Sequence, residues 1–289
     1  MTKFSLNDYV ECKRVAIELL SLCNRDCSFC QRFNDRSGVR KDRNGKSILD
    51  KMPTKHVYSI IDQLAALGFK RTVLFHGFSE PTLDSRLPEF VTYAKEKGMK
   101  VRITTNGDVL RVNNRLCSQL DGLVDVFKIS LYDYTTHKEK VESKKYWQTR
   151  ITKSRITFGN AVEDHYHRDQ SKLLPSELSN QTQAELPCLR THGLYIRYDG
   201  EVGLCCLDDH RSFNLGNAFE TTVEEIWWSD RRIQIANSLK ESGSRNKYNA
   251  CANCYYMPEK NFSFREKTIK RTRRLLFRFG LNPITEKGL

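Results

Sequence analysis

Strand-like and helix-like stretches alternate along the first half of the chain, and this alternation constrains the fold more than any other feature. The helical patterns repeat apolar residues with a helical period and stop at glycines. An alternation of β and α elements implies a parallel sheet, either open or curled into a partial barrel. The strand-like runs are Arg14–Leu20, Thr72–His76, Lys100–Thr104, Val124–Ser130 and Arg155–Phe158. The helical patterns cover three ranges: Thr54 to Gly68, about 86–97 and about 110–120. Thr54 can cap the first of these helices.

Four loops follow the carboxyl ends of these strand-like runs, where the sites of parallel sheets gather. Although the loops are far apart in sequence, we expect them to converge on one mouth of the sheet. They are Cys23–Cys30, Gly77–Pro81, Thr105–Gly107 and Ser130–Asp133.

The first of these loops carries three cysteines, Cys23, Cys27 and Cys30, in a C-x3-C-x2-C spacing. Three thiolates on one short loop can hold three irons of a 4Fe-4S cluster and leave the fourth iron open to a substrate. An open coordination position distinguishes a catalytic metal site from a structural one. The alternative is a zinc or structural iron–sulfur loop, which would need a fourth ligand nearby, and no further cysteine follows before Cys117.

Composition limits the cellular setting. The 289 residues lack an apolar run long enough to cross a bilayer, and the first residues lack the apolar stretch of a signal peptide, so we expect a cytoplasmic protein. In a reducing compartment, ten cysteines at short spacings favour metal binding over disulfides. The 48 Lys and Arg residues against 35 Asp and Glu give a net charge of +13, which suggests an anionic partner or a solvated basic surface. Much of the excess lies in Arg36–Lys51 and in the tail Arg265–Phe279.

The cysteine loop, with Asn24 after the first cysteine and Phe29 before the third, resembles the signature of the radical S-adenosylmethionine (radical SAM) enzymes. In that family the open iron chelates the methionine moiety of SAM, and electron injection produces a 5′-deoxyadenosyl radical. The resemblance implies that Cys23, Cys27 and Cys30 hold the catalytic cluster.

Three further segments resemble the SAM-binding segments of this family. Gly77-Phe78-Ser79-Glu80-Pro81 is similar to the Gly-Gly-Glu-Pro segment, in which Glu80 would accept a charge-assisted hydrogen bond from the methionine amino group. Phe78 and Ser79 replace the glycine pair. Thr104–Gly107 matches a segment near the ribose and methionine, and Ser130 matches a ribose-contacting serine. The resemblance thus assigns Phe29, Gly77, Ser79, Glu80, Thr105, Asn106 and Ser130 to the cofactor site.

A second group of cysteines follows a polar stretch. A hairpin is predicted from Leu194–Tyr198, the turn Asp199-Gly200 and Glu201–Cys206. The arrangement is similar to the auxiliary-cluster domains of this superfamily, named SPASM and, in the half form, twitch. It implies one auxiliary 4Fe-4S cluster held by Cys188, Cys205, Cys251 and Cys254, with Cys206 as the alternative to Cys205 because adjacent strand residues face opposite sides. A zinc knot on the same cysteines is the alternative.

We therefore expect an α/β fold with a partial, TIM-like (β/α)5-6 barrel and a small C-terminal α/β auxiliary-cluster domain. The expected limits are 12–164 for the barrel, 165–187 for a linker, 188–258 for the SPASM/twitch domain and 259–289 for a basic tail.

The resemblance implies a radical SAM oxidoreductase that uses two 4Fe-4S clusters and SAM to abstract hydrogen from its substrate. The half-form cysteine spacing resembles cyclitol dehydrogenases, so we expect a dehydrogenase or epimerase acting on a sugar- or cyclitol-like substrate. The alternatives are a maturase of ribosomal peptides and an RNA-modifying enzyme, although nucleic acid is not the expected partner. A flavodoxin or ferredoxin is the expected reductant, and the basic tail could bind an anionic membrane or an acidic partner.

Overall fold

A single curved sheet organises the molecule. The computed structural model describes residues 12–25, 27, 40–41, 47–48, 50–131, 134, 136–159, 185, 187–188, 191–206, 208 and 211–252. Seven strands pair in the order β7-β6-β5-β4-β1-β8-β9, and all neighbours except β8 and β9 run parallel. The strands are β1 Arg14–Ile17, β4 Thr72–Phe75, β5 Lys100–Thr105, β6 Val126–Ser130, β7 Arg155–Gly159, β8 Gly193–Ile196 and β9 Val202–Gly203, with a separate pair β2 Arg40–Lys41 and β3 Ser47–Ile48.

The structure confirms the five predicted parallel strands, with ends that differ by a few residues. It also adds a sixth, β8, which comes from the predicted C-terminal hairpin. The hairpin is confirmed, but its first strand lies parallel to β1 in the barrel sheet, with Arg14 opposite Gly193 and Ile17 opposite Ile196. The partial barrel is therefore closed further on this side than the five sequence-predicted strands would allow.

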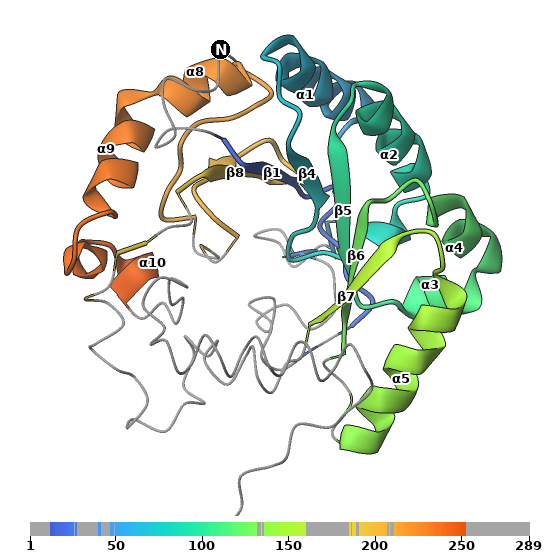
Figure 1. Cartoon of the computed structure of the whole chain (residues 1–289). Coiled ribbons are helices and arrows are strands. Elements are labelled where there is room, and N and C mark those ends of the chain that lie inside the picture. The colour runs from blue at the N-terminus through green and yellow to red at the C-terminus, as the bar shows by residue number, and fades with distance from the viewer. Residues whose placement is uncertain are drawn as a thin grey trace, which may run out of the picture.

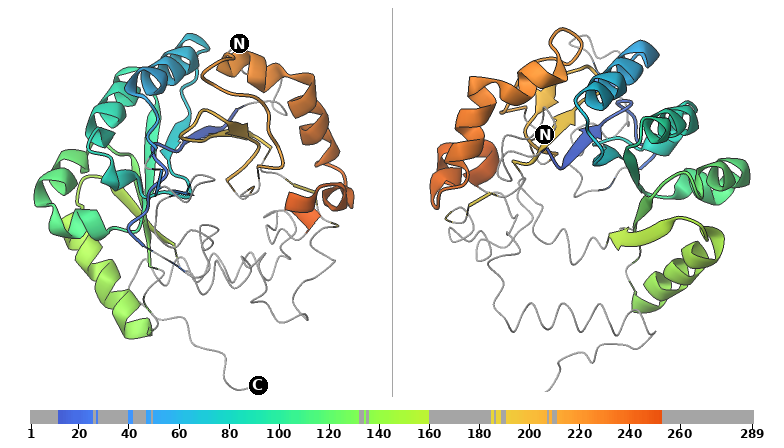
Figure 2. Two further views of the ribbon diagram at one scale, coloured as in Figure 1. Left: turned by 180° about the vertical axis from the view of Figure 1, so that it is seen from behind. Right: turned by 45° about the horizontal axis from the view of Figure 1, so that its top comes forward.

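Helices cover the outer, convex side of the sheet (Figure 1). Figure 2 shows the same arrangement from behind and from above, with α8 and α9 continuing the outer layer beside α1. The helices are α1 Thr54–Ala66, α2 Leu87–Glu96, α3 Asp108–Val112, α4 Asn114–Leu120, α5 His137–Arg150, α8 Val223–Trp228, α9 Asp230–Ser238 and α10 Asn249–Ala252, with 3-10 turns η1 Pro81–Leu83 and η2 Ser244–Lys247.

Three helical details differ from the sequence prediction. Thr54 does not cap α1 but is its first helical residue, because Pro53 occupies the capping position. The predicted helix at 110–120 is two helices, since the Asn113 side chain accepts a hydrogen bond from the Leu116 amide and starts α4 anew. Helix α5 was not predicted, although the Thr136–Glu139 capping box with which it begins can be read from the sequence.

The outer face of the sheet forms the core. Along each parallel strand, alternate apolar side chains are buried against the helices, as Val15 and Ile17 of β1 and Val73 and Phe75 of β4 illustrate. Each such side chain stabilises the fold by about 1.5–3 kcal/mol when fully buried. The core positions fix the register, and the register in turn fixes which side chains point to the other side.

The opposite face of the sheet, here called the inner face, is polar. Parallel pairing aligns Ala16, Leu74, Arg102, Val126 and Arg155 at one level across five strands. The inner face continues toward the carboxyl ends by steps of two residues. Its residues are Arg14, Ala16, Glu18, Thr72, Leu74, His76, Lys100, Arg102, Thr104, Val126, Lys128, Ser130, Arg155, Thr157, Tyr195 and Arg197.

The C-terminal part packs onto the barrel helices. The Val223 amide at the start of α8 donates a hydrogen bond of 2.8 Å to the Gln63 side chain of α1. Arg232 of α9 is buried over the Trp227 ring, 3.3 Å from its centroid, and donates to the Thr191 carbonyl just before β8. Within the described residues, no helix combines the length and apolar character needed to cross a membrane.

Candidate functional site

Cys23 lies in the loop that follows β1, at the carboxyl edge of the sheet, and Cys27 lies four residues further along this loop. The Cys23 sulfur accepts contacts from the Arg25 amide at 3.4 Å and from the Asn106 side-chain amide at 3.8 Å. Donors aimed at a sulfur favour its thiolate form and tune iron–sulfur clusters. The donor set therefore suits cluster ligation. Cys30 and Phe29 lie outside the described residues.

Asp108, at the start of α3, anchors this cysteine loop. Its carboxylate accepts hydrogen bonds from the Arg25 guanidinium at 2.7 Å and from the Asn24 side chain at 2.9 Å. Although partial burial alone would raise the pKa of Asp108, the hydrogen bonds and charge of Arg25 lower the pKa below its ordinary value. Sequence analysis missed Asp108 and Arg25. The only available signal was an acidic residue directly after a strand-end Asn-Gly pair.

Glu80 joins two neighbouring strand-end loops. It is 2% exposed, and its two carboxylate oxygens accept hydrogen bonds from Thr82, from the Thr105 hydroxyl at 2.6 Å and from the Asn106 amide at 2.7 Å. Burial raises the pKa of Glu80, and these hydrogen bonds oppose the rise. The protein itself thus supplies four donors to the carboxylate, which makes Glu80 a structural junction whatever it contacts on a cofactor.

Gly77 is required by the close approach of Glu18. A Cβ atom at Gly77 would lie 2.5 Å from a Glu18 carboxylate oxygen. The same oxygen accepts a 2.7 Å hydrogen bond from the Phe78 amide. The buried Glu18 therefore holds the backbone of the Gly77–Pro81 loop against the end of β1.

The other sequence-predicted cofactor residues lie along the same edge. Thr105 is buried at the end of β5, and its hydroxyl also accepts from the Gly107 amide at 2.9 Å. Gly107 has φ +84°, and a Cβ atom there would lie 2.5 Å from the Trp147 ring, so glycine is needed. By strand register, Asn106 and the buried Ser130 of β6 follow at equal height on adjacent strands. Ser79 directly precedes Glu80. The structure thus brings Cys23, Glu80, Thr105 and Asn106 into direct contact and leaves Ser130 one strand away.

The second cysteine group lies beyond β9. Cys205 and Cys206 follow that strand and are half-buried, Cys188 donates its amide to the Leu239 carbonyl, and Cys251 is buried in α10. Among the residues that the structure describes, no three His, Cys, Asp or Glu side chains form a group that could hold a metal ion. A 4Fe-4S cluster is larger than one ion, and its sulfur ligands lie farther apart. Cys254 falls outside the described part, as do the tail from Arg265 and nearly all of the linker.

A buried network connects these two regions. The Arg197 guanidinium lies 5.5 Å from the Phe78 ring and 5.0 Å from the Tyr195 ring, and it donates to the Asp208 carbonyl beyond Cys205. Burial raises the pKa of Tyr195 well above its ordinary value, and the Glu18 carboxylate adds to the rise. Phe78, which departs from the family pattern, thus contacts residues that lead toward the second cysteine group.

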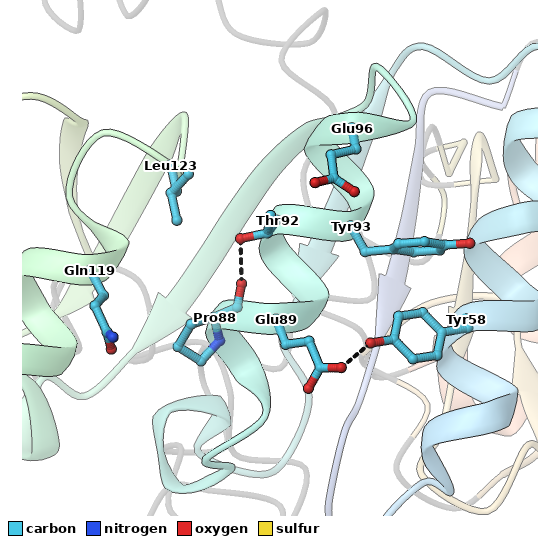
Figure 3. A pocket seen from close by; sticks show the side chains of 8 residues that line it. All are labelled: Tyr58, Pro88, Glu89, Thr92, Tyr93, Glu96, Gln119 and Leu123. Atoms are coloured by element: carbon cyan, nitrogen blue, oxygen red, sulfur yellow. Dashed lines mark hydrogen bonds between the residues drawn. The ribbon is translucent and has the colours of Figure 1, made fainter.

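A separate groove of about 450 Å³ lies on the outer helical layer (Figure 3). There the Tyr58 hydroxyl donates to Glu89, and this contact raises the pKa of Tyr58 to about 12. Thr92 donates to the Pro88 carbonyl at 2.9 Å. The groove is built by α1, α2 and the region of α4, on the face of the sheet opposite the inner face.

Comparison with protein families matches residues 17–155 to the radical SAM superfamily and residues 188–255 to SPASM, an iron–sulfur cluster-binding domain. The chain belongs to the radical SAM superfamily. It is therefore a radical SAM enzyme with a SPASM-type iron–sulfur domain, and SAM and iron–sulfur clusters are its implied cofactors. The α/β partial barrel with a mostly parallel sheet agrees with this membership.

Similar proteins match more than four fifths of this radical SAM enzyme. An S-adenosyl-L-methionine-dependent 2-deoxy-scyllo-inosamine dehydrogenase from Niallia circulans is 26% identical over 250 residues, which cover 83% of this chain and 91% of that protein. The crystal structure of BtrN in complex with AdoMet and 2-DOIA has a TM-score of 0.66 at 22% identity and covers 85% of this chain and 93% of that chain. The structure of SuiB of Streptococcus suis, bound to its precursor peptide SuiA, has a TM-score of 0.50 at 14% identity and covers 84% of this chain and 71% of that chain. At these sequence identities, the similarity to the two solved structures shows a shared fold and no more.

Proposed function

We propose that this radical SAM enzyme is a dehydrogenase that oxidises a hydroxyl-bearing carbon of a sugar- or cyclitol-like substrate. The observation that carries the proposal is its alignment with a cyclitol dehydrogenase over 91% of that protein's length. The polar inner face of the barrel supports a hydroxyl-rich substrate, because buried or half-buried polar side chains need partners that donate and accept hydrogen bonds.

Two sets of cysteines would hold the iron–sulfur clusters. Cys23, Cys27 and Cys30 would ligate the catalytic cluster, and Cys188, Cys205, Cys251 and Cys254 the auxiliary one. When bound, the reduced catalytic cluster and SAM supply a 5′-deoxyadenosyl radical that abstracts a hydrogen atom from carbon, and the auxiliary cluster supplies a one-electron acceptor. An external flavodoxin or ferredoxin would supply the reducing electron.

The protein's own residues would position the reactants. The Glu80 carboxylate fixes the Thr105–Asn106 backbone, and Asn106 in turn contacts Cys23. This chain of contacts holds the cysteine loop at the mouth of the barrel. Further along the inner face, the imidazole of the half-buried His76 can bind a substrate hydroxyl group.

Product analysis tests the proposal. Reconstituted and reduced protein is incubated anaerobically with SAM and 2-deoxy-scyllo-inosamine, together with a panel of sugars, cyclitols and their phosphates. We expect one equivalent of 5′-deoxyadenosine per product and a ketone that is two hydrogen atoms lighter than its substrate. A product of unchanged mass with inverted configuration would instead identify an epimerase, and a modified peptide formed from a precursor would contradict the proposal.

A further inference from the structure

Three arginines face one another on the inner face of the barrel. Arg102 of β5 lies at the same level as Arg155 of β7, two strands away, and Arg14 of β1 lies one step lower on the other side of β4. Strands in a sheet are about 4.8 Å apart, so Arg102 and Arg155 are separated by about 10 Å of backbone, within reach of two long side chains. Lys128 of β6 follows one step above, between them.

The described part of the chain gives this arginine group no acidic counterpart. Within the described part of the chain, no Asp or Glu forms an ion pair with Arg14, Arg102 or Arg155, and the Nε atom of Arg102 is buried without a hydrogen-bond partner. Burial lowers the pKa of Arg102, and the charges of Arg14 and Arg155 lower it further. The structure thus holds like charges together in a partly desolvated place, which is costly unless an anion joins them.

The imbalance extends over the whole inner face. A sheet face with such a charge distribution attracts and retains anions. The cationic side chains on it are Arg14, Lys100, Arg102, Lys128, Arg155 and Arg197, whereas Glu18 is its one acidic residue among those described. Glu18 directly follows β1 and lies beside Arg197, which directly follows β8. Among the described residues, the charged side chains on the half of the inner face built by β5, β6 and β7 are therefore all cationic.

We infer that this half of the inner face binds a phosphoryl group, and that the substrate is a phosphorylated or nucleotide-linked sugar or cyclitol. The inference rests on the proposed function for the sugar part. Guanidinium groups match phosphate oxygens in a bidentate fork, and lysine adds a point charge. Arg102 precedes Asn106 by four residues, and a strand rises about 3.3 Å per residue, so the two positions are about 13 Å apart along β5. An arginine side chain and a sugar ring placed end to end can cover this distance between Arg102 and the mouth of the barrel.

A second basic region must be separated from this site by experiment. A groove of about 450 Å³ at the amino-terminal rim of the sheet is lined by Lys13, Lys70, Arg71, Thr72 and Lys100. Thr72 and Lys100 belong to the lowest level of the inner face as well, whereas Lys13, Lys70 and Arg71 lie outside it. The groove could attract free phosphate by charge alone. Variants are therefore needed in each region.

Calorimetric titration of the cluster-loaded holoenzyme tests the inference with glucose, glucose 1-phosphate, UDP-glucose and inorganic phosphate as probes. We expect at least one phosphorylated sugar to bind at least about tenfold more tightly than glucose. Arg102→Gln and the exposed Arg155→Gln should each weaken that binding about tenfold. Lys13→Gln on the rim and Lys145→Gln on the exposed side of α5 remove the same charge and should leave affinity within about twofold.

Three results would overturn the inference: equal binding of glucose and its phosphorylated forms, equal loss in the inner-face and control variants, or loss on Lys13→Gln alone. Binding of inorganic phosphate without preference for a phosphorylated sugar would reduce the site to a free-phosphate site. SAM cleavage measured on the same samples separates the two proposals. Intact cleavage without phosphoryl binding rejects this inference alone, whereas absent cleavage rejects the proposed function.

Discussion

Glu80 illustrates how a residue suggested by family resemblance acquires a physical role from the structure. Its carboxylate is surrounded by N–H and O–H donors of Thr82, Thr105 and Asn106. Glu80→Gln would turn one acceptor into an NH2 group that faces those donors, and we expect it to destabilise the protein by about 1–3 kcal/mol. Thermal unfolding measures the effect. Glu96→Gln, at an exposed position of the nearby helix α2, is the control and should change little. Equal stability of both variants would contradict the assignment of Glu80 as a junction.

Asp108 leads to a pH-dependent prediction. Since the pKa of Asp108 is lowered in the folded state, its contribution is present above the unfolded-state pKa of about 3.9 and is lost as the pH falls through the lower folded-state value. Asp108→Asn should therefore cost about 1 kcal/mol near pH 7, a value reduced for partial exposure, and progressively less below about pH 4. Thermal unfolding of the cluster-free protein across this pH range measures the difference. A cost that grows toward low pH would show that the Arg25 contact is not its source.

Family resemblance located Glu80, Thr105 and Asn106 in the sequence because each lies in a short motif at a strand end. The Arg25–Asp108 pair was not found, because its members are 83 residues apart and nothing local links them. Their pairing depends on β1 and β5 ending at the same edge. Cationic residues on the inner face were likewise hidden, since their shared orientation follows from strand register alone.

At the scale of elements, the strands with alternating buried positions were predictable, and the rest required tertiary structure. The sequence of β8 predicts a hairpin strand but does not show which sheet the strand joins. Only its parallel pairing with β1 makes it part of the barrel sheet. Helix α5 was missed because Ser143 and Trp147 are its only buried residues, so no apolar stripe marks it. Its existence follows from its capping box and from packing against the sheet.

The pairing of β8 with β1 gives a matched test with two glycines. A Cβ atom at Gly193 would lie 2.8 Å from the Arg14 carbonyl oxygen, whereas at Gly203 the nearest atom, in the Tyr195 ring, is 4.0 Å away. Gly193→Ala should therefore destabilise the protein by about 1–3 kcal/mol through overpacking, and Gly203→Ala should have a much smaller effect. Chemical denaturation measures both. If the two variants lost equal stability, β8 would not lie against β1 as described.

At the scale of the whole molecule, two cysteine groups in one chain predict two clusters. After anaerobic reconstitution we expect about eight iron atoms per chain, and the triple change of Cys23, Cys27 and Cys30 to alanine should leave about four. Iron and zinc analysis measures this. About four irons with one zinc in the unaltered protein would contradict the auxiliary cluster and retain the catalytic one.

The basic tail from Arg265 adds a prediction that the sequence alone supports. Deletion of residues 265–289 should abolish binding to anionic vesicles at low salt while both clusters stay intact. Vesicle sedimentation measures the binding. Loss of cluster-loaded protein on deletion would show instead that the tail is part of the fold.

The central claim is that the mouth formed by Cys23, Glu80 and Asn106 performs radical SAM chemistry. Its most direct test is to incubate reduced, cluster-loaded protein with SAM alone and to quantify 5′-deoxyadenosine by chromatography. We predict slow cleavage by the unaltered protein and none by Cys23→Ala, because we expect the catalytic cluster to need all three cysteines of the loop. Fully cluster-loaded and reduced protein that forms no 5′-deoxyadenosine, or a Cys23→Ala variant that forms as much as the unaltered protein, would contradict the account.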